Sequence, residues 1–235
     1  MNYKAEQLFY YDIETAGNYK DLNVCKEKNP REYELFLKKY EKKKEDPHWK
    51  GTPEEAYLNN AGLMPEYGRV VCVTIGFFKQ EDGEHEPTYK MVSLTSDNEK
   101  ELILKCKKYF DRIQDNRAKL CGFNIKRFDG PFLVKKFLKY GIKVPENLST
   151  YNKKPWEIDV EDLLDIWSSN SFKDFTSFDE MCKDLDVESP KSDISGDKVH
   201  HVYWNVEHGI NRIVKYCEND VRALKDCALK LFNCL

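Results

Sequence analysis

The chain has 235 residues, of which 40% are hydrophobic and 13% aromatic, with 38 lysines and arginines against 41 aspartates and glutamates. This composition is sufficient for one packed domain and excludes a disordered chain, while a net charge of −3 excludes nucleic-acid binding by bulk positive charge. The sequence has no run of roughly 20 apolar residues and no secretory signal. We therefore expect a cytoplasmic protein that does not contact membranes.

The first half of the chain predicts three strands and a helix around an insertion. The aromatic-rich segment 8–15 is typical of a strand buried on both faces. Segments 69–78 and 88–94 are apolar and β-branched, and a glycine-containing turn separates them, which predicts a hairpin. Ser96 and Glu99 have the spacing of a capping box, so we expect a helix to begin there.

The second half begins with a strand and a helix. Residues 119–124 form a short apolar run typical of a strand. Pro131 is expected in the first turn of a helix that Gly141 ends. The pattern of segment 157–167 is compatible with either a short strand or a helix.

Two further helices complete the predicted order. Ser177 and Glu180 again have capping-box spacing. Apolar residues recur at three- and four-residue intervals from about His208 to Phe232, which predicts a long helix with one broad buried face. This order of strands and helices indicates an α/β domain whose mixed central sheet is flanked by helices.

An insertion at about 17–64 differs in character from the rest. Between positions 26 and 50 there are nine lysines and arginines against six aspartates and glutamates. A narrow stripe at helical spacing is formed by Tyr33, Phe36, Leu37 and Tyr40. We expect a charged, largely helical insertion whose amphipathic helix rests on the core, with a nucleic-acid contact as the alternative.

The cysteines and histidines do not have the spacing of a metal site. The eight cysteines include no C-x-x-C pair and most lie in apolar runs, which indicates buried free thiols. His200 and His201 have no matching cysteine or histidine at ligand spacing, and we expect both to be surface or loop residues.

Asp12 and Glu14 are the first candidates for chemistry. They are two residues apart on a predicted strand, so both side chains point to one face, together with Tyr10. Paired carboxylates in an apolar strand are unfavourable unless a cation neutralises them, and a hard divalent metal with oxygen ligands would do so. A strand end that emerges into water is the alternative explanation.

Two other acidic positions are ambiguous when each is taken alone. Asp129, in GFNIKRFDGPFL (122–133), stands at a strand-to-helix junction, where an aspartate is also an ordinary helix cap. Tyr216 and Asp220, in YCENDV, are four residues apart and share one face of the last helix, as a surface polar pair would.

Taken together, the three motifs resemble those of the DEDD 3′–5′ exonucleases. FYYDIET, GFNIKRFDGPFL and YCENDV are similar to motifs of the exonuclease domains of family-B DNA polymerases. They are more similar still to stand-alone bacterial and phage proteins predicted to be related 3′–5′ exonucleases. Segments 58–73 and 191–204 share this likeness, which covers nearly the whole chain outside 17–57.

The resemblance implies an RNase H-like (DnaQ-like exonuclease) fold with a mixed five-stranded sheet, in one domain over residues 1–235. It also implies two magnesium or manganese ions. Asp12 would bridge them, Glu14 and Asp220 would bind the ion on the nucleophile side, and Asp129 would bind mainly the other ion.

The spacing in the last motif assigns a subtype within the resembling family. The histidine subtype places its histidine five residues before the last aspartate, and Lys215 occupies that position here. Tyr216 lies four residues before Asp220 and would orient the attacking water, so the tyrosine subtype (DEDDy) is implied.

The resemblance further implies release of nucleoside monophosphates from 3′ ends of single-stranded DNA, with Thr15, Asn124 and Phe128 near the terminal nucleotide. The six lysines and arginines within 126–143 line either a phosphate path or an exposed helix face. RNase D-like trimming of RNA 3′ ends and a catalytically weak nucleic-acid-binding module are the alternatives. A separate polymerase or a replication or repair protein is an expected partner.

Overall fold

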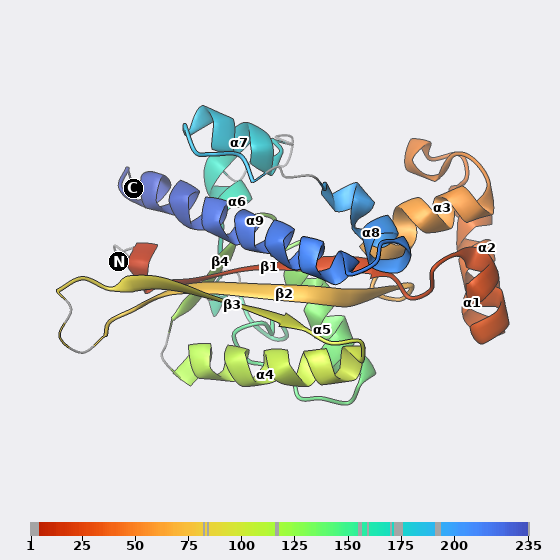
Figure 1. Cartoon of the computed structure of the whole chain (residues 1–235), viewed down its shortest axis with the longest axis horizontal. Helices are drawn as coiled ribbons and strands as arrows, with labels where there is room; N and C mark the ends of the chain where they lie inside the picture. Colours follow the sequence, from red (N-terminus) through yellow and green to blue (C-terminus); the bar gives the residue numbers. More distant parts are fainter. Residues whose placement is uncertain are drawn as a thin grey trace.

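The computed structural model describes residues 5–81, 83, 85–115, 118–154, 157–158, 160–169, 171, 176–190 and 194–234. Its centre is a five-stranded sheet of order β3-β2-β1-β4-β5 (Figure 1). The strands are β1 (Leu8–Gly17), β2 (Gly68–Lys79), β3 (Thr88–Thr95), β4 (Lys119–Gly122) and β5 (Val160–Asp162). β1 pairs antiparallel with β2 and parallel with β4, so the predicted mixed sheet is confirmed.

Helices cover both faces of the sheet and extend it at one end (Figure 1). They are α1 (Leu22–Lys28), α2 (Pro30–Lys43), α3 (Pro53–Asn60), α4 (Glu99–Asp115), α5 (Asp129–Lys139), α6 (Leu163–Trp167), α7 (Phe178–Asp184), α8 (Val199–Asn205) and α9 (Gly209–Phe232). α4 and α5 lie on one face, and α9 lies on the other with α6, α7 and α8 around it (Figure 1). Within the described residues, no helix is long and apolar enough to cross a membrane.

Most predicted elements form at the expected positions. β2 and β3 make the hairpin, although residues 82 and 84 of its turn lie outside the described residues. Segment 157–167 contains both of its candidate structures, because β5 is followed directly by α6. The capping box at Ser177 is present, and α9 begins directly after His208.

Alternation along β1 divides its side chains between two hydrophobic cores. Tyr11 and Ile13 pack towards α4 and α5, whereas Tyr10 packs towards α9. The strand is therefore buried on both faces, as its aromatic content predicts. The same alternation directs Asp12 and Glu14 to the face that α9 covers.

β2 contains a β-bulge opposite the end of this acidic pair. Glu14 lies opposite Cys72 and Thr15 lies opposite Val70, so Val71 is the extra residue. Val71 and Cys72 both pack on the α9 face, as two consecutive residues of a bulge can. Because a bulge bends its strand and increases the local twist, it adjusts the ladder next to Glu14.

The insertion helices α1, α2 and α3 form a small core of their own at one end of the sheet (Figure 1). Phe36 of α2 is fully buried. Its ring centroid lies 5.8 Å, 5.0 Å and 5.3 Å from those of Trp49, Tyr57 and Tyr67. We expected the apolar stripe of α2 to rest on the core of the domain. Instead it packs on aromatic residues from the insertion and next to it, in a separate cluster.

His200 is buried in α8, so its prediction as a surface or loop residue is wrong. Its Nδ1 accepts the backbone N–H of Gly17 at 2.9 Å, and its Nε2 lies 3.0 Å from the carbonyl of Lys20. A Cβ at position 17 would lie 2.9 Å from His200 Cε1, so a larger residue there would have to displace the ring. The ring is held by two backbone groups that are about 180 residues away in the chain, so the local sequence around His200 gives no sign of them. His201 is exposed, as predicted.

The start of α4 also corrects a prediction. Asn98, not Ser96, caps the helix, because its Oδ1 accepts the backbone N–H of Lys100 at 3.0 Å. Glu99 turns into the core instead of towards Ser96, and its Oε1 accepts the N–H of Val70 at 2.8 Å. The capping-box spacing fails here because tertiary partners bind the glutamate.

Lys136 of α5 is fully buried, so it is not part of a basic surface path. Its ammonium lies 3.2 Å from Glu99 Oε1 and donates to the carbonyl of Gly68. The hydroxyl of Tyr140 donates to the same glutamate at 2.5 Å. Burial lowers the pKa of Lys136 to about 8. This buried ion pair joins α4 to α5, and its hydrogen bonds extend to β2.

Replacing Lys136 with methionine is expected to lower the free energy of unfolding by about 3 kcal/mol, because it leaves the Glu99 carboxylate buried without its closest cation. Chemical denaturation measures this loss. Lys135→Met is the matched control, since Lys135 pairs with Glu66 at the surface and should cost less than about 1 kcal/mol. Equal losses in the two variants would contradict a structural role for the buried pair.

Candidate active site

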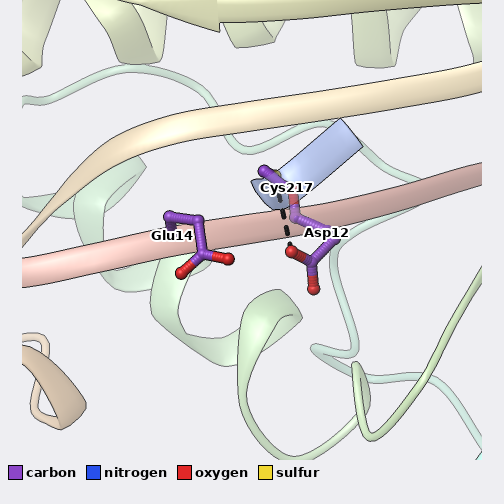
Figure 2. Close-up of side chains that lie close together, drawn as sticks. All are labelled: Asp12, Glu14 and Cys217. Carbon is purple, nitrogen blue, oxygen red and sulfur yellow. Dashed lines mark hydrogen bonds between the residues drawn. The ribbon is translucent and has the colours of Figure 1, made fainter. Parts of the chain in front are cut away.

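β1 presents Asp12 and Glu14 side by side (Figure 2). Glu14 is buried and Asp12 is half-buried. Their carboxylate oxygens and the sulfur of Cys217 all lie within 4.8 Å of one another. Tyr10 shares this face, but its hydroxyl donates to the carbonyl of Ala5 at 2.6 Å and is occupied there. The predicted acidic pair is therefore a compact cluster inside the fold.

Asp129, the first residue of α5, approaches β1 through a main-chain hydrogen bond. Its Oδ1 accepts the N–H of Ile13 at 3.1 Å, and its side chain is buried. Because Ile13 lies between Asp12 and Glu14, this bond places the third carboxylate beside the first two. A simple helix cap does not account for a bond to a strand 116 residues away.

The turn that carries Asp129 is held by Asp162, which sequence reasoning did not single out. The buried carboxylate of Asp162 accepts backbone N–H groups from Asn124 at 2.7 Å, Lys126 at 3.0 Å and Leu164 at 3.1 Å. Asn124 has a φ of 58°, a left-handed conformation that asparagine tolerates better than most residues. The available signal was an aspartate directly before the apolar LLDIW, which is N-cap spacing.

Tyr216 and Asp220 lie one turn apart on α9 and influence each other's ionisation. Burial, followed by the nearby Asp220 carboxylate, raises the pKa of Tyr216 above its usual value, so the tyrosine keeps its proton. Asp220 is buried and Tyr216 half-buried, whereas Lys215 is exposed. A Cβ at Gly196 would lie 4.0 Å from the Tyr216 hydroxyl, so the segment before α8 lies next to this tyrosine.

Cys217 is a further member of the cluster that sequence reasoning missed. Its Sγ lies 3.4 Å from Asp12 Oδ2 and donates to it (Figure 2). Burial raises the pKa of the thiol well above its usual value, so the thiol keeps its proton and acts as a donor. The signal was its position three residues before Asp220, which places both on one face of the helix.

The four carboxyl groups hold their protons more tightly than isolated acids do. Burial, followed by repulsion from neighbouring carboxylates, raises the pKa of Asp12 and Glu14 well above the usual range. Burial raises the pKa of Asp129 to about 7 and that of Asp220 to about 7. The cluster is thus a buried, oxygen-rich set of acids that ionises together only with difficulty. That is the donor set that a hard divalent cation fits.

Two of the predicted substrate contacts adjoin these carboxylates in the chain, since Thr15 follows Glu14 and Phe128 precedes Asp129, and Asn124 lies in the turn before α5. Thr15, Asn124 and Phe128 are all half-buried. Phe128 packs on Phe132 with ring centroids 5.7 Å apart. Alternation along β1 places the Thr15 side chain on the face opposite Asp12, which leaves its backbone as the group nearer the carboxylates.

The basic segment 126–143 is largely neutralised by ion pairs. Lys126 and Arg127 pair with Asp165, Lys135 with Glu66, and Lys136 and Lys139 with Glu99. Only the Lys135–Glu66 pair is exposed on both sides, and it contributes little energy; the carboxylates of Asp165 and Glu99 are largely buried, with the partner cations of Lys126, Arg127 and Lys139 partly exposed. The segment is therefore mainly a helix face with local charge balance, and a phosphate path along it stays a prediction.

Comparison with known proteins adds independent information about this site. Residues 63–223 match the model of a family described as predicted 3′–5′ exonucleases related to the exonuclease domain of PolB. The chain belongs to this family. The matched region contains Asp129, Tyr216 and Asp220, but it begins after β1. Asp12 and Glu14 therefore lie outside the matched region, and it is the fold that brings them close to Asp129 and α9. No curated protein matches the sequence.

The fold agrees with that membership. A family B DNA polymerase from the hyperthermophilic archaeon Pyrobaculum calidifontis superimposes with a TM-score of 0.52 at 16% identity, over 95% of this chain and 24% of the polymerase. The chain thus spans about a quarter of the length of that polymerase. At this identity the likeness concerns the fold alone, and it confirms the RNase H-like arrangement with a mixed five-stranded sheet.

Proposed function

We propose that this protein is a metal-dependent 3′–5′ exonuclease that releases nucleoside monophosphates from single-stranded DNA ends. The observation that carries the proposal is the convergence of four carboxylates from β1, α5 and α9 on one buried site. Each has a pKa raised by burial. Membership in a predicted 3′–5′ exonuclease family supports the same reaction class.

The donor set fits two hard divalent ions. Asp12, Glu14, Asp129 and Asp220 would hold magnesium or manganese, which prefer carboxylate oxygens. When bound, such ions supply a nucleophile from water at neutral pH and stabilise the charge that develops on the leaving 3′ oxygen.

The protein groups around the carboxylates orient them for this task. Cys217 donates to Asp12, and the backbone of Ile13 donates to Asp129, so hydrogen bonds from neutral groups orient both carboxylates. Tyr216 lies one turn from Asp220 on α9, and we propose that its hydroxyl orients the attacking water.

DNA is the favoured substrate because the family is related to the exonuclease domain of a DNA polymerase. Trimming of RNA 3′ ends is the second candidate within the same fold. The deciding experiment incubates the protein with 5′-labelled DNA and RNA oligonucleotides, in manganese and in chelator. We expect stepwise shortening of DNA from the 3′ end only with metal. No shortening of either substrate would refute the exonuclease proposal.

Tyr216→Phe is expected to lower the cleavage rate on the order of 10- to 100-fold, because it removes the hydroxyl that positions water. Manganese affinity should change little, since the four carboxylates stay. Single-turnover rates and a manganese titration measure the two effects separately. Tyr151→Phe, at a side chain that is 82% exposed, serves as the control. A wild-type rate in Tyr216→Phe would contradict the positioning role.

A further inference from the structure

A cavity lies behind the carboxylate cluster, on the face of the sheet that α5 covers. Its volume is ≈ 300 Å³, and it is enclosed by α5, the turn before α5, β1 and parts of 148–160. Ile125, Val134 and Leu148 contribute apolar walls. Small-molecule pockets are mostly apolar with a few placed polar groups, and this volume is near the lower end of their range. The cavity is therefore suited to one compact ring system.

One polar group in the lining lacks a partner. Tyr11 is only 1% exposed, and its hydroxyl forms no hydrogen bond with the described residues. Gly130 lines the same cavity, and a Cβ there would lie 3.6 Å from this hydroxyl. The hydroxyl is therefore a polar group that the cavity offers to a ligand. A ligand with a donor or acceptor at its edge would bond to it.

Two lysines stand among the lining residues. Lys126 Nζ lies 3.1 Å from Asp165, and Lys135 Nζ lies 2.8 Å from Glu66. Both ammonium groups are partly exposed, and the Lys135 pair is an exposed surface pair of the kind that exchanges readily. An anionic group on a bound ligand could therefore recruit either lysine, while the lysine stems extend the apolar wall.

We propose that this cavity binds a nucleobase. The ring faces would lie against the apolar walls, an edge heteroatom would bond to the Tyr11 hydroxyl, and the attached phosphate would lie near Lys126 and Lys135. A hydrocarbon chain would leave Tyr11 without a bond. The choice of a nucleobase among planar heterocycles rests on the proposed exonuclease function, which supplies both free nucleotides and single strands.

The position of the cavity connects it to the catalytic carboxylates. Tyr11 directly precedes Asp12 in β1, and Gly130 directly follows Asp129 in α5. A base in the cavity would contact the backbone segments that carry both acids. Occupancy of the cavity is thus expected to alter the cleavage rate as well as to bind the ligand.

Isothermal titration of the chelator-treated protein with dAMP and with a short oligothymidylate tests the proposal without metal at the carboxylates. Tyr11→Phe should weaken binding about fivefold through loss of one hydrogen bond. Val134→Trp fills the cavity and should weaken it at least about tenfold. Tyr10→Phe is the matched control, because the Tyr10 hydroxyl bonds to Ala5 on the opposite face.

The two probes distinguish the source of the base. Pocket-dependent binding of dAMP identifies a free nucleotide, and pocket-dependent binding of the oligonucleotide alone identifies a base of the substrate strand. Wild-type affinity for both probes in Tyr11→Phe, or no binding to the wild type, overturns the proposal. Oligonucleotide cleavage by the same preparation is scored separately, so a catalytically active protein with no cavity binding refutes only the nucleobase site.

Discussion

Asp12→Ala and Asp220→Ala are each expected to lower the exonuclease rate by at least about a thousandfold. Each removes a carboxylate from the shared donor set, and the charge stabilisation that bound metals provide is worth several kcal/mol. Single-turnover cleavage of a labelled DNA strand at saturating manganese measures the loss. Glu207→Ala is the control, because this acid is exposed beside His208 at the start of α9.

Misfolding will not explain this loss, because both substitutions remove an acid that burial penalises. Without metal at pH 8, the two variants should therefore unfold at temperatures equal to or above that of the wild type. A lower unfolding temperature together with the lost rate would indicate a structural role for these acids. A rate within tenfold of the wild type would contradict their place in the catalytic site.

In metal-free protein, raising the pH from 5.5 to 8 is expected to lower the free energy of unfolding. The pKa of Asp129 and of Asp220 is about 7 in the folded protein, against about 3.9 in an unfolded chain. Between these values the folded state binds more protons than the unfolded state, so stability falls as the pH rises. Between pH 5.5 and 8, one such carboxyl accounts for a loss on the order of 2 kcal/mol.

Two other buried groups act in the opposite direction but do not change the sign. Burial lowers the pKa of His200, so this residue contributes stability that increases as the pH rises through its unfolded value. This single histidine is outweighed by the four carboxyl groups, whose contribution to stability falls as the pH rises. Lys136, with a pKa of about 8, contributes stability that increases only above pH 8, outside the chosen window.

Manganese is expected to reverse the loss, raising the unfolding temperature more at pH 8 than at pH 5.5, because protons compete with the metal for the carboxylates. Thermal unfolding at both pH values, with manganese and with chelator, measures the effect. The double variant Asp12→Asn/Asp220→Asn should lose most of the manganese response. An equal manganese shift at both pH values, retained in that variant, would place the metal elsewhere.

The local spacing of the site residues was determined by the sequence. Asp12 and Glu14 share a face because a strand alternates every two residues, and Tyr216 reaches Asp220 because a helix turns every 3.6 residues. The order of strands and helices, the capping box at Ser177 and the turn at Gly141 are likewise local properties. They depend on backbone geometry within a few residues, which is why they could be predicted.

Contacts between distant segments were decided by the tertiary structure. The bond from Ile13 to Asp129, the clamp of Asp162 on the turn and the thiol of Cys217 at Asp12 all join separate elements. Glu99 and His200 were misread because buried partners far along the chain outcompete the solvent or local cap that their spacing suggests.

The charge of the protein is likewise set partly by the sequence and partly by the fold. A net charge of −3 is a property of the sequence, but its distribution is not. The fold buries four acids together and pairs most of the basic residues in 126–143 with acids from other segments. Because burial raises the energy of a charge and pairing lowers it, only the three-dimensional arrangement determines which of these charges are available to a metal or a nucleic acid.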